Sequence, residues 1–238
     1  MSPRIALIHA TPVSIEPIGA AFRELWPEAS PWNLLDDSLS TDLQAAGSLT
    51  PAIRERFLRL GDYCAFCGVD AILFTCSAFG EAIEGVQARL SIPVLKPNEA
   101  MIEEALESGR RIGMLVTADI SIRSMRPEFE TAAAACGVDL TFETAAVPDA
   151  MQALLEGDRE RHDALIVKRA ASLTNSDVLA LTQFSMAHVA ARIAPVPGRR
   201  VLTTPASAIA RLRSILDLKR ARTVASSAAG ADRRAVRR

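Results

Sequence analysis

The sequence is poor in the features that mark several classes of protein. Aromatic residues make up only 5% of its 238 residues and are not interleaved with basic ones, so the stacking platforms of single-stranded nucleic-acid binders are missing. The net charge of -1 leaves no overall field to attract nucleic acid. No apolar run is long enough to span a bilayer, and no signal peptide is recognisable. We therefore expect a cytoplasmic protein that binds neither nucleic acid nor membrane.

Cysteine is also scarce, with four residues in the chain. Cys64 and Cys67 form a C-x-x-C pair, a spacing found in zinc and redox sites. No second pair of this kind and no nearby pair of histidines completes a zinc site. The pair lies in the segment 53–68, whose apolar residues recur at helical spacing. We interpret both cysteines as packing residues of an amphipathic helix and predict no metal site.

Short apolar runs bounded by polar residues recur along the chain and alternate with segments of helical periodicity. This alternation predicts an α/β fold with mostly parallel sheets. Thr50-Pro51 is a favourable helix start, with threonine as the N-cap and proline at the first helical position. Helices are predicted at 127–136 and 205–218, among others. The predicted strands are 5–8, 32–35, 71–75, 93–95, 111–116, 140–142, 178–181 and 201–202.

The most informative stretch is DAILFTCSAFG, residues 70–80. Its apolar run ends abruptly in Thr75-Cys76-Ser77, which suits a buried strand followed by a polar loop. Open α/β sheets bind ligands at the carboxyl ends of their strands. Cys76 is therefore either a reactive thiol at a ligand site or a small buried packing residue.

An internal repeat gives Cys76 a counterpart. When the chain is shifted by 107 residues, RIALI at Arg4 falls on RIGML at Arg111, and DAILFTC falls on DVLALTQ. Cys76 then coincides with Gln183. We infer two similar halves, related by a pseudo-two-fold axis, whose strand ends converge on one crevice with Cys76 and Gln183 on opposite sides.

Two groups on opposite sides of a substrate suit proton transfer at carbon, with one group for each face. Thiols serve this purpose because nearby donors lower their pKa. The segment Ser77–Gly80 leads into a predicted helix, whose free backbone N–H groups could favour a thiolate at Cys76 and hold a substrate carboxylate. A glutamine cannot exchange protons at useful rates, so Gln183 is expected to orient or hydrogen-bond.

The motifs FTCSAFG, HATP (9–12), VTADIS (116–121) and LTQFSM (181–186) resemble those of the aspartate/glutamate racemase superfamily. That group includes hydantoin racemases, maleate isomerases and arylmalonate decarboxylases. The resemblance covers residues 4–216 and implies a cofactor-independent enzyme with one catalytic cysteine from each lobe. Cys76 matches the first-lobe cysteine, whereas Gln183 replaces the second. The resemblance also implies that the final helix packs on the first lobe and is compatible with a homodimer.

Two functions follow from this comparison. The first is a cofactor-independent enzyme in which Cys76 transfers a proton at the carbon alpha to the carboxylate of a small acid, by racemisation, isomerisation or one-cysteine decarboxylation. The second is a non-catalytic small-molecule binder on the same fold. The residues expected to bind substrate, each with turn or capping duty as its alternative, are Thr11, Ser14, Thr75, Ser77, Thr117, Gln183 and His9.

The repeat and the resemblance divide the chain into three parts. Residues 1–97 with 205–218 are predicted to form the first α/β lobe, and 98–204 the second. Residues 219–238 are rich in Arg, Ala and Ser and have few large apolar side chains, so we predict a disordered basic tail. His9 ends the first strand, where it either contacts substrate or is a hydrogen-bonded structural histidine, and His188 is expected on the surface or in packing.

Overall fold

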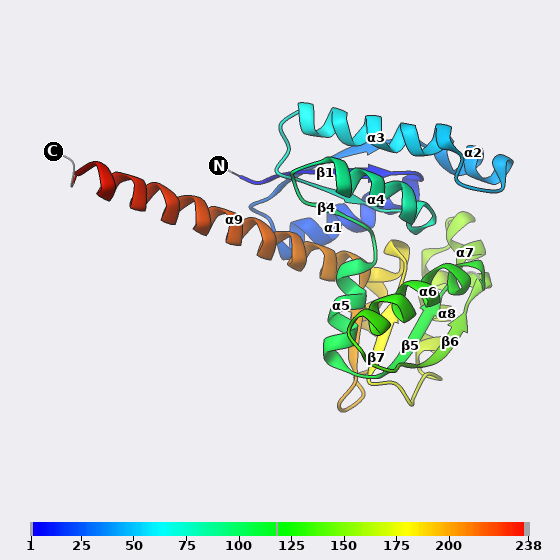
Figure 1. Cartoon of the computed structure of the whole chain (residues 1–238). Coiled ribbons are helices and arrows are strands. Elements are labelled where there is room, and N and C mark those ends of the chain that lie inside the picture. Colours follow the sequence, from blue (N-terminus) through cyan, green and yellow to red (C-terminus); the bar gives the residue numbers. More distant parts are fainter. Residues whose placement is uncertain (1, 118, 236–238) are drawn as a thin grey trace.

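The computed structural model describes residues 2–117 and 119–235 and contains two α/β units, each built on a four-stranded parallel sheet (Figure 1). This confirms the predicted fold class. The first sheet has the strand order β2-β1-β3-β4 and the second the order β6-β5-β7-β8. The strands are β1 (Arg4–His9), β2 (Ser30–Leu35), β3 (Ala71–Phe74), β4 (Val94–Leu95), β5 (Arg111–Val116), β6 (Thr141–Ala146), β7 (Val178–Leu181) and β8 (Arg200–Thr203).

Helices cover both faces of each sheet, which explains why the strands are apolar on both sides. On the first sheet α3 and α4 pack against one face, and α1 and α9 against the other. On the second sheet α5 and α6 cover one face, and α7, α8 and η3 the other. The helices are α1 (Ile15–Leu25), α2 (Ser38–Ala46), α3 (Pro51–Phe66), α4 (Gly80–Arg89), α5 (Glu99–Ser108), α6 (Asp119–Ala135), α7 (Pro148–Leu155), α8 (Arg159–Ala170) and α9 (Thr204–Ala235), with 3-10 helices η1 (Pro12–Ser14), η2 (Ser77–Phe79) and η3 (Phe184–Arg192).

The internal repeat is visible in the strand register. Ile5 of β1 lies opposite Ala71 of β3, and the residues 107 positions later, Ile112 and Val178, lie opposite each other in the second sheet. The pairing of β3 with β4 recurs between β7 and β8 at the same offset. The two units therefore place equivalent residues at equivalent strand ends.

The helix α3 forms as its sequence predicts. The hydroxyl of Thr50 accepts a hydrogen bond from the backbone N–H of Ile53 at 3.3 Å, and Pro51 occupies the first turn. Cys64 is fully buried in the core, and burial raises the pKa of its thiol to about 12. Cys67 is half-buried and is not disulfide-bonded to Cys64. A thiol this difficult to ionise is suited to packing rather than to redox chemistry.

The ends of two helices differ from the predictions. Helix α6 begins at Asp119, so Pro127 lies inside it instead of at its start. Helix α9 continues to Ala235, although composition predicts disorder from Lys219 onward, because alanine and arginine are strong helix formers. Residues 236–238 of that predicted tail lie outside the described part. Within the described residues, no helix combines the length and the apolar character needed to cross a membrane.

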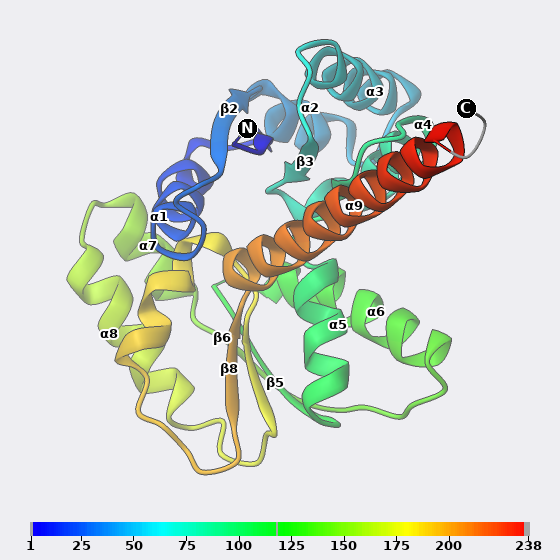
Figure 2. The same ribbon diagram turned by 90° about the vertical axis from the view of Figure 1, so that its left-hand side faces the viewer.

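Helix α9 connects the two units. Its first half contacts α1 of the first unit and α5 of the second, and Ile209 and Leu212 are buried in the core of the first sheet. The family resemblance predicts this packing of the final helix on the first unit. The second half projects away from the body of the protein (Figures 1 and 2).

Candidate active site

Cys76 stands directly beyond the end of β3. The backbone N–H of Thr75 donates to the carbonyl of Ile8 at 3.0 Å, which extends the pairing of β1 with β3 by one residue. Cys76 follows in an extended conformation, and the chain then turns into η2 and α4. The thiol is half-buried against the apolar cluster under α3 and α4. The sequence prediction of a strand-end cysteine is therefore confirmed.

The environment of Cys76 favours the protonated thiol. Burial raises its pKa, and a hydrogen bond from the backbone N–H of Ala78 offsets only part of this effect. The sequence analysis expected backbone N–H groups here to favour a thiolate. One such hydrogen bond is present, but removal of the thiol from water outweighs it. At neutral pH the thiol of Cys76 is therefore protonated, and it can donate a proton but not accept one.

His9 is the centre of a buried hydrogen-bond network. Its Nε2 lies 2.9 Å from Oδ1 of Asn33, and its Nδ1 lies 2.8 Å from the hydroxyl of Thr75 and 3.0 Å from that of Ser14. Because the amide oxygen of Asn33 only accepts, this assignment puts the proton of His9 on Nε2 and leaves Nδ1 to accept from Thr75. Burial lowers the pKa of His9, so the imidazole is neutral.

This network lies directly before Cys76 in the fold. His9 is fully buried, and the hydroxyls of Ser14 and Thr75 lie 2.9 Å apart, so all three side chains satisfy one another. Their effect is to fix the backbone immediately before Cys76. Contact of His9, Ser14 or Thr75 with a substrate stays a prediction.

On the second sheet, Thr117 and Gln183 form a pair at the ends of β5 and β7. The side-chain oxygen of Gln183 accepts two hydrogen bonds from Thr117, from the backbone N–H at 2.6 Å and from the hydroxyl at 2.8 Å. No hydrogen bond within residues 2–117 and 119–235 uses the amide nitrogen of Gln183. That half-buried group is therefore the part of the pair available to a ligand.

The strand ends of the two units adjoin. Segment η1, which follows β1, contacts η3, which follows β7, and η2 beside Cys76 contacts α6. Phe184, the residue after Gln183, is buried in the core of the first unit. No hydrogen bond among the described residues joins the His9 network to the Thr117–Gln183 pair. The two predicted groups are thus neighbours across a junction and not parts of one network.

Thr11 and Ser77 are the predicted site residues with unsatisfied hydroxyls. Both are half-buried, and in the described part of the chain neither hydroxyl makes a hydrogen bond. Thr11 precedes η1 and Ser77 opens η2, so they come from the two loops that meet the second unit. These hydroxyls are free to donate to a substrate carboxylate.

Asn33 is the site residue that the sequence analysis missed. It lies in β2 and bonds His9 across the first sheet, although 24 positions separate the two residues. The available signal was an amide inside the apolar run Trp32–Leu35, although Asn33 itself is exposed and only its contact with His9 connects it to the buried network.

A cavity of about 790 Å³ lies elsewhere, between α1, η3, β8 and α9. His188 and Arg159 are among its lining residues, and none of the eight predicted site residues is. We place the candidate chemistry at the strand ends rather than in this cavity, because the cavity lining contains no thiol and the strand ends are where open α/β sheets bind ligands.

Comparison with known proteins agrees with this architecture. The aspartate racemase of Picrophilus torridus aligns with a TM-score of 0.63 at 12% identity, covering 86% of this chain and 90% of that one. An aspartate racemase homologue from Pyrococcus horikoshii aligns at 0.61 and 16% identity, covering 90% and 99%. The allantoin racemase of Klebsiella pneumoniae aligns at 0.61 and 17% identity, covering 92% and 89%. At these identities the likeness shows a shared fold.

A match to a family model shows which family the chain belongs to, whereas structural similarity at these identities shows only the fold. No curated protein matches the chain. The model described as Asp/Glu/Hydantoin racemase matches residues 40–212, which include both Cys76 and Gln183. The match covers most of the chain, with β3 and β4 of the first sheet and all four strands of the second. The chain therefore belongs to the Asp/Glu/Hydantoin racemase family.

Proposed function

We propose that this protein is an enzyme that moves a proton at the carbon alpha to the carboxylate of a small acid, without a cofactor, and that Cys76 is its catalytic residue. Membership of the family supports the reaction class. The position of Cys76 at the end of β3, on a junction between two equivalent strand ends, is the observation that carries the proposal.

In the proposed mechanism the substrate carboxylate lies beside the start of α4. The hydroxyls of Ser77 and Thr11 and the free N–H groups of the η2 turn would donate to it and stabilise an enolate-like intermediate. In a decarboxylation, the bond between the alpha carbon and a second carboxylate breaks first, which releases carbon dioxide and leaves the electron pair in the enolate. The S–H bond of Cys76 then breaks as a C–H bond forms at that carbon. The thiolate left behind keeps the hydrogen bond from Ala78 and then regains a proton from solvent.

Gln183 has a positioning role in this proposal. Thr117 holds its carbonyl oxygen, so the amide NH₂ is turned toward whatever occupies the junction. This group can donate to a second carboxylate or carbonyl oxygen of the substrate but cannot accept the proton that two-thiol racemisation requires. One-proton reactions, decarboxylation or isomerisation, fit the pair of Cys76 and Gln183 better than two-base racemisation.

Hydrogen–deuterium exchange at the alpha carbon tests the proposal. Candidate amino acids, hydantoins and malonates are incubated in D₂O and followed by NMR. Exchange with inversion indicates racemisation, and release of carbon dioxide with single deuterium incorporation indicates decarboxylation. We expect Cys76→Ala to slow the reaction by about 10²–10⁴-fold, the usual contribution of a general acid or base. Cys67→Ala removes a half-buried thiol at the C-cap of α3 and is the matched control. Full activity in Cys76→Ala would refute the assignment.

The raised pKa of Cys76 also favours the second candidate, a non-catalytic binder of small carboxylates. A thiol that burial keeps protonated is alkylated slowly at neutral pH in either case, so alkylation does not separate the two functions. Binding of a carboxylate without exchange at any alpha carbon would establish the binder.

A further inference from the structure

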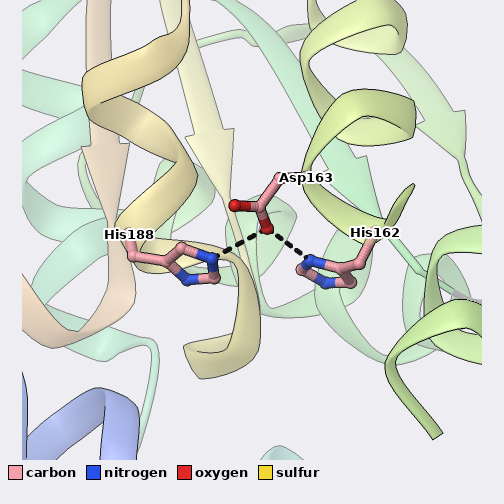
Figure 3. Close-up of side chains that lie close together, drawn as sticks. All are labelled: His162, Asp163 and His188. Carbon is pink, nitrogen blue, oxygen red and sulfur yellow. Dashed lines mark hydrogen bonds and ion pairs between the residues drawn. The ribbon is translucent and has the colours of Figure 1, made fainter. Parts of the chain in front are cut away.

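A second cluster of chemically active side chains lies away from Cys76. His162 and Asp163 are neighbours on α8, and His188 comes from η3 (Figure 3). Oδ1 of Asp163 lies 2.8 Å from Nδ1 of His162 and 2.8 Å from Nε2 of His188. These three donor atoms all lie within 4.8 Å of one another. Two imidazole nitrogens and a carboxylate oxygen form a ligand set that zinc commonly adopts.

The distances are close to those that a zinc ion requires. Zinc binds such atoms at about 2.0–2.2 Å, which places donor atoms of a tetrahedral site roughly 3.4 Å apart. In the cluster two separations are shorter than this and the third is no more than 4.8 Å. Binding of the ion requires both 2.8 Å separations to lengthen, through a shift of the Asp163 carboxylate away from His162 and an outward movement of His188. Its side chain is 45% exposed, whereas that of His162 is fully buried, so one ligand is fixed and the other can adjust.

The surroundings prepare the carboxylate for this role. Arg192 donates to the other oxygen of Asp163 at 2.9 Å and is itself paired with Glu160 at 3.1 Å. Arg192 thus orients the carboxylate, leaving Oδ1 for the ion, and Glu160 offsets its charge. Asp163, Glu160 and Arg192 together carry one net negative charge when both histidines are neutral, and this charge favours binding of a cation.

His162 is the fixed ligand of the proposed site. Its imidazole is fully buried, and among the described residues its only hydrogen bond joins Nδ1 to Asp163, where the ion would sit. When Nδ1 binds the ion, the ring proton lies on Nε2, which has no hydrogen-bond partner in the described structure.

We propose that His162, Asp163 and His188 bind a zinc ion with water as the fourth ligand. The sequence analysis predicted no metal site because nothing completes the C-x-x-C pair, and two adjacent residues on one helix with a histidine 25 positions later match no recognised ligand spacing. The ion would connect α8 to η3, the segment that begins directly after Gln183. Its role is then to hold the Gln183 side of the candidate active site. The site itself does not depend on the proposed reaction.

Zinc binding by the full-length protein tests the proposal. Chelator-treated protein is titrated with Zn²⁺ alone in competition with a chromophoric chelator. We expect one equivalent to bind to the wild type, and His188→Ala to weaken binding by more than about tenfold, since even loss of a supporting group beyond the ligands costs about 10–100-fold. Cys67→Ala is the control for the C-x-x-C pair and is expected to bind as the wild type does.

A second measurement guards against misfolding of the variant. His188 is half-exposed, so His188→Ala is expected to fold, which circular dichroism checks. Zinc should raise the melting temperature of the wild type and of Cys67→Ala but not that of His188→Ala. The near-ultraviolet absorption of the Co²⁺-substituted protein should lack the thiolate charge-transfer band. Failure of the wild type to bind zinc, equal binding by His188→Ala, or loss of binding in Cys67→Ala would each overturn the proposal.

Discussion

Glu128 on α6 provides a sharp test of how the junction between the two units responds to pH. The side chain is half-buried, and burial raises the pKa of its carboxyl to about 7. The positive charge of Lys96 lowers this pKa, whereas the nearby carboxylates of Glu99 and Glu84 raise it further. Lys96 follows β4 and is already paired with Glu84 at 2.8 Å, so it neutralises Glu128 only in part.

The sign of the effect follows from linkage. A carboxyl with a raised pKa holds its proton more tightly in the folded state, so it stabilises the fold at low pH, and this advantage is lost as pH rises through about 7. A rise from 4.5 to about 7 corresponds to an upper limit of roughly 3 kcal/mol. Partial exposure of the carboxyl screens its charge, so we expect roughly 1–3 kcal/mol.

The substitution Glu128→Gln imitates the protonated form at every pH. We expect it to increase the free energy of unfolding by roughly 1–3 kcal/mol at pH 8, and to leave it nearly unchanged at pH 4. Urea denaturation at both pH values measures this difference. Glu107→Gln, at an exposed position of α5 with no partner in the described structure, is the matched control and should change stability little at either pH. A stability gain that is independent of pH, or a loss at pH 8, would refute the reasoning.

Two further predictions concern His9 and a close helix contact. Burial lowers the pKa of His9, so the contribution of His9 to stability is present above its unfolded-state pKa of 6.5 and is lost as pH falls below that value. His9→Gln should flatten the dependence of the unfolding free energy on pH, measured by urea denaturation. An unchanged dependence on pH would contradict a neutral imidazole at His9. Gly61→Ala should destabilise by about 1–2 kcal/mol, because its Cβ would lie 2.5 Å from Cγ1 of Val86 and overpacking outweighs the gain in helix propensity. The control Gly85→Ala meets only Leu58 at 3.7 Å and should stabilise, so an equal sign for both alanine variants in thermal denaturation would exclude steric overlap as the cause.

The strand ends could be predicted because their signals are local. The apolar run before Thr75 and the polar residues after it identify a buried strand and its end without reference to any other part of the chain. The repeat then aligned Cys76 with Gln183, and the identical strand register of the two sheets confirms that alignment. Register follows from the apolar pattern, since a shift by one residue would expose the buried face.

The helix ends that were misjudged show where local rules compete. The sequence predicts a helix start at Pro127, but tertiary packing of Met125 and Phe129 into one core keeps the helix continuous across the proline. In α9 the helix propensity of alanine and arginine carries the helix past the buried Leu216 to Ala235.

By itself the sequence determined the fold class, the family resemblance and the two facing strand ends, because apolar periodicity and repetition are properties of the chain. Tertiary structure alone decided the protonation of Cys76 and the neutral state of His9, because burial depends on residues distant in sequence. It also decided that Asn33 meets His9 and that His188 meets Asp163. Such contacts form only when separate elements pack, and no local pattern encodes them.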